Sequence, residues 1–512
     1  MRSFFSVICC VFIVSCSSEK STFSSTSALP NVVYILADDL GYGDLSCLNE
    51  QGKIKTPHLD TLASNGMKFT DAHSGSAVCT PTRYGVITGR YAWRSRLKRG
   101  VLGGSSPHLI NMDRMSVADV FNKKGYHTAM IGKWHLGWDF TKLGERNKDE
   151  EGTIGGDGRK IDFTKPVMNG PDGLGFDYYY GHCGSLDMAP YVYVENGKVT
   201  SPPPYQETVN KDKKGFWRKG ATAKDFIHED VTPNFVRRTC KYIRERAKTG
   251  KPFFVYLPLP SPHTPILPTK DFLGKSGTNE YGDFVQQVDH HVGEIVDTLK
   301  KAGVLNNTLV IFTSDNGCSP RADYNELAKV GHNPSGQFRG HKADIFEGGH
   351  RVPFLVHWPA KVAKGSVSKE VICLTDLMAT AAEITGITLP DNVAEDSFSI
   401  LSALEGGKTQ RTSTIHHSIN GSFAIRKGDW KLITCPGSGG WSAPGPRKKD
   451  STKGLPKFQL YNLKDDIGEK NNLYKEMPTV VDELLKLLGD TVNNGRSTPG
   501  PKQTNEGETV YQ

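Results

Sequence analysis

The sequence predicts an α/β fold with a mainly parallel central sheet flanked by helices, followed by a smaller C-terminal subdomain of antiparallel sheet and helix. Three observations predict it. Short apolar runs alternate with amphipathic helical patterns over residues 30–400. The 512 residues exceed what one small domain needs. From residue 401 to 512 closely spaced short strands and turns take over, which predicts a second, smaller unit.

Five segments have the composition of buried strands, because they are short, apolar and rich in β-branched or aromatic residues. They are residues 31–37, 126–132, 253–257, 308–313 and 352–358.

Helical patterns lie between these strands. One predicted helix places four apolar side chains on a single face, with Asn65-Gly66 near its end: Leu59, Leu62, Ala63 and Met67. A second begins at a capping box formed by Ser116 and Asp119 and ends at Gly125. A third covers residues 284–299 and closes at Gly303.

The C-terminal part has a different texture. Residues 422–425, 430–434 and 457–461 are predicted strands, and residues 480–488 a helix. Residues 436–456 are rich in Gly, Pro, Ser and Lys, which predicts a mobile loop.

The N-terminus has the pattern of an export signal. Residues 4–14 are apolar but too short to span a bilayer. The end of this run, Ile13-Val14-Ser15-Cys16, is similar to a bacterial lipobox, so we expect a signal peptide over 1–15, a lipid anchor at Cys16 and a tether over 16–29. Ordinary signal-peptidase cleavage is the alternative. Both predict an exported protein, in the periplasm or at the cell surface.

The charge of the chain argues against nucleic acid as a partner. The net charge is +8, without the concentrated basic stripe of nucleic-acid-binding proteins. A mildly basic surface suits an anionic substrate instead.

Polar residues follow four of the predicted strands directly. They are Asp38-Asp39, Lys133-Trp134-His135, Ser261-Pro262-His263 and Asp315-Asn316-Gly317. Ligands bind beyond the carboxyl ends of parallel strands, so these segments are expected to meet at one rim. Each cluster alone has a simpler interpretation, a turn or a structural histidine; together they predict a site.

Two kinds of chemistry are present in this predicted site. Asp38, Asp39, Asp315 and Asn316 offer only oxygen ligands, which hard cations such as calcium or magnesium prefer; we infer calcium, because no nucleotide site is evident. A cationic set suits a tetrahedral anion and supplies proton donors. Its members are Arg83, Lys133, His135, His263 and Lys342.

The segment Cys79-Thr80-Pro81-Thr82-Arg83 closely resembles the signature of the formylglycine-dependent sulfatases. The core C-x-P-x-R alone would recur by chance, so the order of the surrounding motifs carries the resemblance. These motifs are residues 37–44 (ADDLGYGD), 84–90 (YGVITGR), 132–137 (GKWHLG), 314–317 (SDNG) and 347–353 (EGGHRVP).

The resemblance implies the fold of the alkaline phosphatase superfamily and a nucleophile made from Cys79. In that family a maturing enzyme oxidises the motif cysteine to formylglycine, which hydrates to a diol and also binds the metal. One diol oxygen attacks sulfur and releases the alcohol, and the other expels sulfate. A structural cysteine, free or in a disulfide, is the alternative for Cys79.

The resemblance also assigns roles position by position. Asp38, Asp39, Asp315 and Asn316 match the calcium ligands of the family. Arg83 and Lys133 match residues that hold formylglycine and sulfate, and His135 the residue that helps to break down the sulfated intermediate. His263 and Lys342 match groups near the leaving oxygen and the sulfate; the match at Lys342, within Arg339-Gly-His-Lys342, is loose.

The substrate is expected to be a sulfated oligo- or polysaccharide, with galactose or N-acetylgalactosamine 6-sulfate as the leading candidate from general resemblance. His182 and Asp187 are candidates for sugar contacts, and packing of an interior turn is the alternative. Trp441 either stacks on a sugar or covers the C-terminal subdomain.

Two other functions remain open at this point. One is a phosphodiesterase or phosphonate monoester hydrolase of the same superfamily, some of which also use formylglycine. Its two-metal phosphatase relatives need histidine-rich zinc sites, and His290-His291 fit a solvated helix face better. The other is a non-catalytic glycan-binding lipoprotein with this fold.

Overall fold

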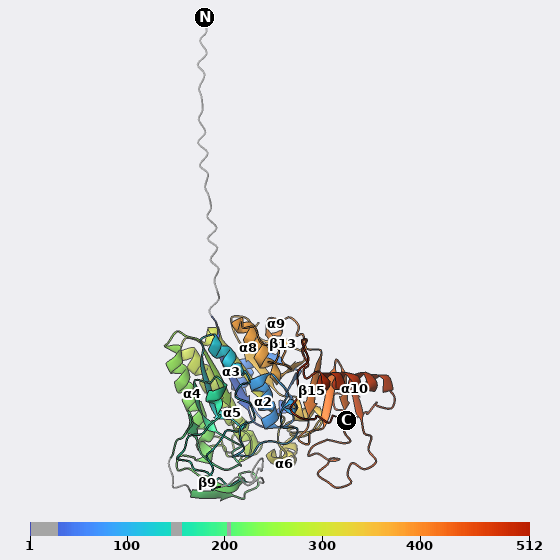
Figure 1. Ribbon diagram of the computed structural model, residues 1–512, viewed down its shortest axis with the longest axis horizontal. Helices are drawn as coiled ribbons and strands as arrows, with labels where there is room; N and C mark the ends of the chain where they lie inside the picture. Colours follow the sequence, from blue (N-terminus) through green and yellow to red (C-terminus); the bar gives the residue numbers. More distant parts are fainter. Residues whose placement is uncertain (2–28, 145–155, 202–205, 512) are drawn as a thin grey trace.

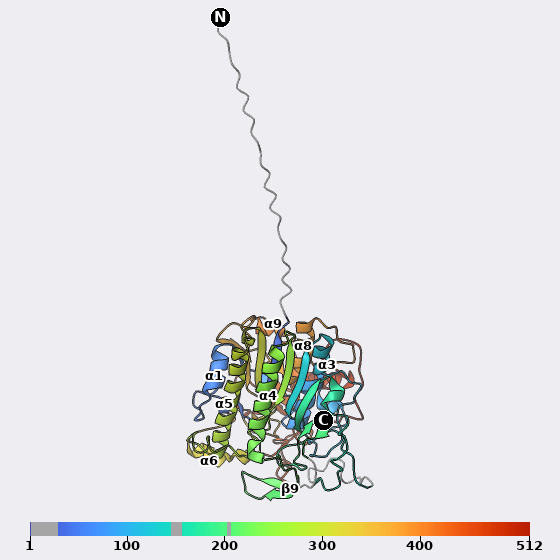
Figure 2. The same ribbon diagram turned by 90° about the vertical axis from the view of Figure 1, so that its left-hand side faces the viewer.

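The central sheet of the computed structural model has ten strands (Figures 1 and 2). The structure describes residues 1, 29–144, 156–201 and 206–511. From one edge to the other, the order is β13 (Ser366–Ser368), β2 (Met67–Phe69), β12 (Phe354–His357), β11 (Thr308–Ser314), β1 (Asn31–Ala37), β10 (Phe253–Pro258), β4 (His127–Lys133), β5 (Tyr178–His182), β6 (Val194–Glu195) and β7 (Lys198–Val199).

The middle of this sheet is parallel. Strands β11, β1, β10, β4 and β5 pair in parallel with one another in this order, whereas β12 pairs antiparallel with β11 and β6 with β5. The residues of β1 and β11 are all buried, because helices cover both faces of the sheet. The expected mainly parallel α/β sheet is confirmed.

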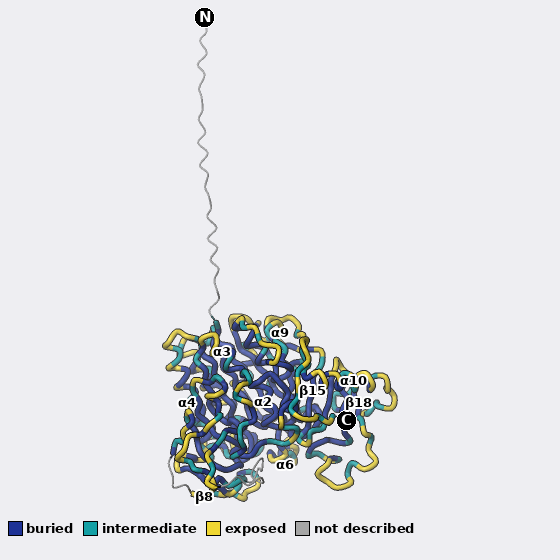
Figure 3. Tube along the Cα trace, in the orientation of Figure 1, coloured by how far each residue is buried: buried dark blue, intermediate teal, exposed yellow. Residues whose placement is uncertain are grey.

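Helices lie on both faces of the sheet. Helices α4 (Val231–Ala247) and α5 (Glu280–Lys301) cover one face, and α2 (Cys79–Thr88), α3 (Val117–Lys123) and α8 (Leu377–Thr385) lie on the other (Figures 1 and 2). Figure 3 shows that the buried residues concentrate in the sheet between these layers. One continuous apolar core results.

The predicted elements can be compared directly with the observed ones. All five predicted strands are present, with bounds that differ by two residues at most. The capping box of α3 is also present: the Ser116 hydroxyl accepts from the backbone N–H of Asp119, whose carboxylate accepts from that of Ser116. Met67 is a correction. Helix α1 (Pro57–Ser64) stops before Gly66, and Met67 begins strand β2.

A second, antiparallel sheet follows, with the order β15 (Ser413–His417), β16 (Phe423–Lys427), β17 (Trp430–Ile433) and β18 (Gln459–Asn462). We call it the C-terminal sheet. Helix α10 (Pro478–Asn493) shares a small apolar core with it, as expected. Strand β15 escaped prediction because only Ile415 is apolar in its sequence STIHH.

Two expectations concern segments outside regular structure. The predicted signal peptide and tether, including Cys16, fall almost entirely outside the described residues. Within the described part of the chain, no helix is both long enough and apolar enough to cross a membrane. Residues 436–456 contain no helix or strand, but Ser438 and Gly440 are buried, so the beginning of this loop is packed against the protein.

Candidate active site

The site lies at the carboxyl ends of the parallel strands. Ala37 and Ser314 are paired at the ends of β1 and β11, so Asp38 and Asp315, the next residues of each strand, emerge side by side. Lys133 is the last residue of β4, which is separated from β1 by the parallel strand β10. The predicted convergence of these segments on one rim is therefore what the sheet register produces.

Cys79 is the first residue of helix α2, and Val78 before it is extended. This position places the side chain at the positive end of the helix dipole. Arg83 follows one turn later, on the same helix face. The Cys79 thiol and carboxylate oxygens of Asp38 and Asp315 lie within 4.8 Å of one another. All described cysteines, Cys79 included, are free thiols.

The cations Arg83 and Lys133 hold the two carboxylates. The Arg83 guanidinium donates to Asp315 Oδ2 through Nε at 3.0 Å and Nη2 at 2.8 Å, and to the Lys133 carbonyl through Nη1 at 3.0 Å. Lys133 Nζ donates to Asp38 Oδ2. All four side chains are fully buried, so this network excludes water from the base of the site.

Asp39 is held by a second group of residues. Its φ of 64° turns the chain sharply after β1. Lys342 Nζ lies 2.7 Å from Asp39 Oδ1, and Asn316 Nδ2 donates to the same oxygen at 2.7 Å. His263 Nε2 is 3.6 Å from Asp39 Oδ2. Residues that follow three different strands thus meet at one carboxylate.

Two oxygens of the predicted metal ligands have no hydrogen-bond partner among the described residues. They are Asp38 Oδ1 and Asn316 Oδ1, both buried. A buried acceptor left alone is costly, and buried acceptors normally have partners. The donor set around them consists of carboxylate and amide oxygens, which is the set that hard divalent cations prefer. The residues present therefore fit a calcium-type ion.

The charges of this site perturb one another strongly. Burial opposes ionisation of Asp38, but Lys133, His263, Arg83 and Lys342 outweigh it and hold the pKa of Asp38 well below its ordinary value. Burial and the charge of Asp38 raise the pKa of Asp315 to about 7. Two carboxylates thus compete for the same cationic neighbours.

The two histidines of the site are biased towards the neutral form. Burial lowers the pKa of His135 well below its ordinary value, and Lys133 adds to the effect. His135 Nε2 is 2.8 Å from the Leu102 carbonyl, while Nδ1 has no partner. Burial and the nearby Lys342 also lower the pKa of His263. Both rings are thus favoured in the neutral form, in which one nitrogen donates a hydrogen bond and the other accepts one.

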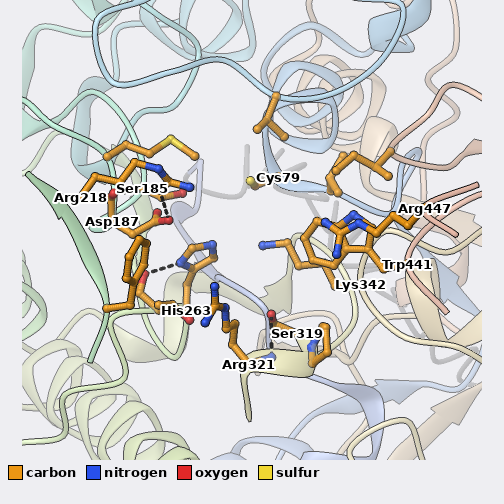
Figure 4. A pocket seen from close by; sticks show the side chains of 17 residues that line it. Cys79, Ser185, Asp187, Arg218, His263, Ser319, Arg321, Lys342, Trp441 and Arg447 are labelled. Atoms are coloured by element: carbon orange, nitrogen blue, oxygen red, sulfur yellow. Dashed lines mark hydrogen bonds and ion pairs between the residues drawn. The ribbon is translucent and has the colours of Figure 1, made fainter. Parts of the chain in front are cut away.

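A cavity of about 500 Å³ opens above the Cys79 side chain. Figure 4 shows Cys79 at its base, with Lys342 and His263 projecting from opposite sides. Arginines gather around its wall, and one carboxylate, Asp187, faces them. The cavity therefore joins the buried ionic network to solvent through a mainly basic opening.

A protein-family model described as Sulfatase matches residues 30–387. The chain belongs to the sulfatase family. A second model, described as N-sulphoglucosamine sulphohydrolase, C-terminal, matches residues 341–438 of this sulfatase.

Two named sulfatases are similar to this chain over most of its length. This sulfatase is 35% identical over 500 residues to N-acetylgalactosamine-6-O-sulfatase of Bacteroides thetaiotaomicron, with 90% of this chain and 93% of the relative covered. It is 31% identical to human arylsulfatase A, with 94% and 91% covered. The chain is thus a sulfuric ester hydrolase.

Solved structures support the fold. One solved structure comes from work on the metabolism of multiple glycosaminoglycans by Bacteroides thetaiotaomicron. It matches this chain with a TM-score of 0.78 and 34% sequence identity, and the match covers 91% of this chain and 99% of that chain. A chain crystallised in complex with a neocarrahexaose has a TM-score of 0.68 at 23% identity, covering 93% of this chain and 95% of that chain, and shows the fold alone.

The sugar-contact candidates of this sulfatase occupy different positions. Asp187 lines the cavity; its Oδ2 pairs with Arg218, and its Oδ1 has no partner. His182 is buried at the end of β5, where its ring is parallel to that of Phe235 at 5.9 Å between centroids. Among the described residues that line the cavity, His182 is absent.

Several cavity residues escaped prediction. Arg218, Arg321 and Arg447 line the opening, together with Trp441, which the sequence had singled out. Their segments are far apart in the chain, and no motif joins them. Residues 436–456 had been interpreted as a mobile loop, so only their basic composition was available as a signal.

Proposed function

We propose that this sulfatase removes sulfate from a sulfated glycan, with a nucleophile made by oxidation of Cys79 to formylglycine. The observation that carries the proposal is the position of Cys79 at the base of the cavity, beside Asp38 and Asp315 and at the start of a helix. The surrounding sequence Cys79-Thr80-Pro81-Thr82-Arg83 supports maturation, because it resembles the family's signature.

The residues around Cys79 fit this chemistry. Hydrated formylglycine supplies two hydroxyls, one to attack sulfur and one to expel sulfate. Arg83 and Lys133, fixed on Asp315 and Asp38, keep the base of the site positively charged. Lys342 and His263 line the cavity, where they are suited to contact a sulfate oxygen and the leaving oxygen. His135 is a suited proton acceptor through its unpartnered Nδ1.

A calcium ion is the proposed cofactor, held by Asp38, Asp39, Asp315, Asn316 and residue 79. A divalent cation there would neutralise the carboxylates and polarise a sulfate oxygen. The unpartnered Asp38 Oδ1 and Asn316 Oδ1 support it. Zinc is less suitable, because the oxygen donors that it would meet suit a harder ion.

For the substrate we propose a galactose or N-acetylgalactosamine 6-sulfate within an oligo- or polysaccharide. The relative named N-acetylgalactosamine-6-O-sulfatase supports the sugar. The cavity, at about 500 Å³, is large enough to suit a saccharide, and Asp187 Oδ1 is an unpartnered acceptor for a sugar hydroxyl. His182 is buried and is not among the residues that line the cavity; its unpartnered Nε2 remains a proposed contact.

Export is a further part of this proposal. The apolar run over residues 4–14 and the lipobox-like Cys16 support transport out of the cytoplasm and a lipid anchor, with a maturing enzyme acting on Cys79. Mass spectrometry of the N-terminal peptide checks the anchor. A free N-terminus beyond Cys16 would exclude lipidation while leaving the enzymatic proposal intact.

A matched set of esters tests the function. Release of sulfate is measured from galactose and N-acetylgalactosamine 6-sulfate and from the corresponding 4-sulfates, and release of phosphate from a phosphodiester. We expect the 6-sulfates to be cleaved fastest and Cys79→Ala to release no sulfate. Faster cleavage of the phosphodiester would favour the phosphoryl hydrolase. Binding without cleavage by matured protein would favour the non-catalytic glycan binder.

A further inference from the structure

A second basic group lies at the opening of the cavity, apart from the ionic network at its base. It consists of Arg218, Arg321 and Arg447, which come from three distant segments. Asp187 is the only acidic side chain that lines the cavity within the described chain. The opening thus carries more positive than negative charge, and the three arginines differ in their ion-pair partners.

Arg218 is already neutralised. Its Nη1 pairs with Asp187 Oδ2 and also donates to the Asp187 carbonyl at 2.9 Å. The guanidinium lies 5.5 Å from the centre of the Phe216 ring. A salt bridge of this kind leaves Arg218 with little attraction for a further anion.

Arg321 and Arg447 have no carboxylate partner among the described residues. Arg321 lies 5.4 Å from the centre of the Phe216 ring, and its Nη1 donates to the Lys213 carbonyl at 3.4 Å. Arg447 lies 4.1 Å from the centre of the Trp441 ring. Burial lowers the pKa of Arg447; the charge of Asp344 opposes this effect, and the charge of Arg321 on the same cavity wall adds to it.

The loop that carries Arg447 is fixed beside the catalytic network. The backbone N–H groups of Trp441 and Ser442 donate to Asp344 Oδ1 at 2.7 and 2.9 Å. Asp344 follows Lys342 by two residues, so the loop is anchored next to the site. Figure 4 shows Trp441 and Arg447 beside Lys342, with Arg218 and Asp187 across the cavity.

We propose that Arg321 and Arg447 form a second anion-binding subsite, which holds a carboxylate or a second sulfate on the sugar next to the one that is desulfated. Guanidinium groups bind both anions through paired hydrogen bonds. An anion between two unpaired arginines also relieves their repulsion, and the Trp441 ring keeps Arg447 oriented. The inference rests on the proposed function, and it makes an anionic oligosaccharide the preferred substrate class.

The test compares three disaccharides that share the same 6-sulfated sugar. Its neighbour is a neutral sugar, a uronate or a sugar with a second sulfate. Binding to Cys79→Ala protein is measured by titration calorimetry, so turnover is not needed. We expect at least one anionic disaccharide to bind about tenfold more tightly than the neutral one, equivalent to one charge-assisted hydrogen bond.

Variants in the Cys79→Ala background locate the preference. R321A and R447A should each remove most of it, and R447K should retain part, because a lysine keeps the charge but not the fork. K448A is the matched control: Lys448 is exposed in the same loop and does not line the cavity. Circular dichroism confirms that each variant is folded.

The outcomes separate this subsite from the proposed function. If R321A and R447A weaken binding of the uronate disaccharide alone, the subsite holds a carboxylate. If they weaken binding of the disulfated disaccharide alone, the subsite holds a sulfate. Equal binding of all three disaccharides, no measurable binding of any, or equal weakening of all three by R321A and R447A would overturn the subsite. Sulfate release by matured wild-type enzyme tests the proposed function separately.

Discussion

Two buried ionic clusters of this protein have similar composition but differ in how far their polar atoms find hydrogen-bond partners. One is the network of the proposed active site around Asp38, Asp315 and Cys79, which we call the active-site network. The other, which we call the histidine cluster, lies between the main sheet and the C-terminal sheet. Its members are Asp71, His73, Glu347, His350, Arg351, His416, Arg426, Lys431 and Glu469.

In the histidine cluster every ring nitrogen has a partner. His73 contacts Asp71 at 2.7 Å and His350 at 3.1 Å. The other nitrogen of His350 meets Lys431 Nζ at 3.0 Å. His416 contacts the Ser74 carbonyl and the Thr414 hydroxyl, both at 2.9 Å. The spacing of these three histidines would permit a metal, but their nitrogens are engaged and a lysine lies among them.

The comparison teaches that composition and burial alone do not identify a reactive site. The active-site network leaves Asp38 Oδ1 and Asn316 Oδ1 without partners and adjoins a cavity. The histidine cluster satisfies its ring nitrogens and joins two sheets. We therefore expect changes in the first cluster to alter activity and changes in the second to alter stability.

The largest expected effect is on the active-site network. Asp315→Ala removes a proposed metal ligand and the partner of Arg83, so kcat/KM for sulfate release should fall by about a thousandfold or more. Chelation of wild-type enzyme should have the same effect, and calcium should restore activity better than zinc. Asp391→Ala, at an exposed aspartate, is the control. Full activity of metal-free enzyme would contradict the metal assignment.

In the histidine cluster, Lys431→Ala should reduce the free energy of unfolding by about 3–5 kcal/mol, because Glu347 and Glu469 lose a buried counter-ion. Denaturant unfolding measures this. Lys427→Ala on the same sheet is exposed and should change stability by less than about 0.5 kcal/mol. Equal effects of the two substitutions would show that the cluster does not join the sheets as described.

The pH dependence of stability sharpens the same comparison. Burial and Arg351 lower the pKa of His73 from 6.5 to about 4, so the folded state binds fewer protons than the unfolded state in this range. The contribution of His73, about 3 kcal/mol, is complete above pH 6.5 and is lost as pH falls towards 4.

The slope of stability against pH measures this contribution. Glu469 acts in the opposite direction, since burial and the charge of Glu347 raise its pKa to about 7. The difference between wild type and His73→Gln therefore isolates the histidine. The variant should have a flatter slope between pH 4 and 6.5, and parallel curves would refute the assignment.

Much of the fold was predictable because its signals are local. The strand β1 was predicted to the residue, since apolar and aromatic residues follow Asn31 without interruption to its end. Asp38, Asp315 and Lys133 were predictable as neighbours, because the ends of parallel strands meet at one edge. Met67 was placed wrongly because its apolar side chain also fits a helical face, and the chain turn at Gly66 decides otherwise.

The cavity wall was not predictable for a physical reason. Arg321 and Arg447 come together only through tertiary contacts, and the loop of Trp441 is fixed by hydrogen bonds to Asp344 rather than by its own sequence. The histidine cluster also combines residues from β3 (Ala72–His73), α7 (Glu347–His350) and the C-terminal sheet. No sequence pattern signals such long-range pairing.

The most direct measurement concerns residue 79. In protein made together with a maturing enzyme, the peptide that contains Cys79 should weigh about 18 Da less than its cysteine form, because hydrogen sulfide is exchanged for one oxygen. Sulfate release should rise in proportion to the converted fraction. Cys79→Ser should accumulate a sulfated serine, since it lacks the second hydroxyl that expels sulfate. Sulfate release at the wild-type rate by Cys79→Ala would place the nucleophile elsewhere and contradict the account.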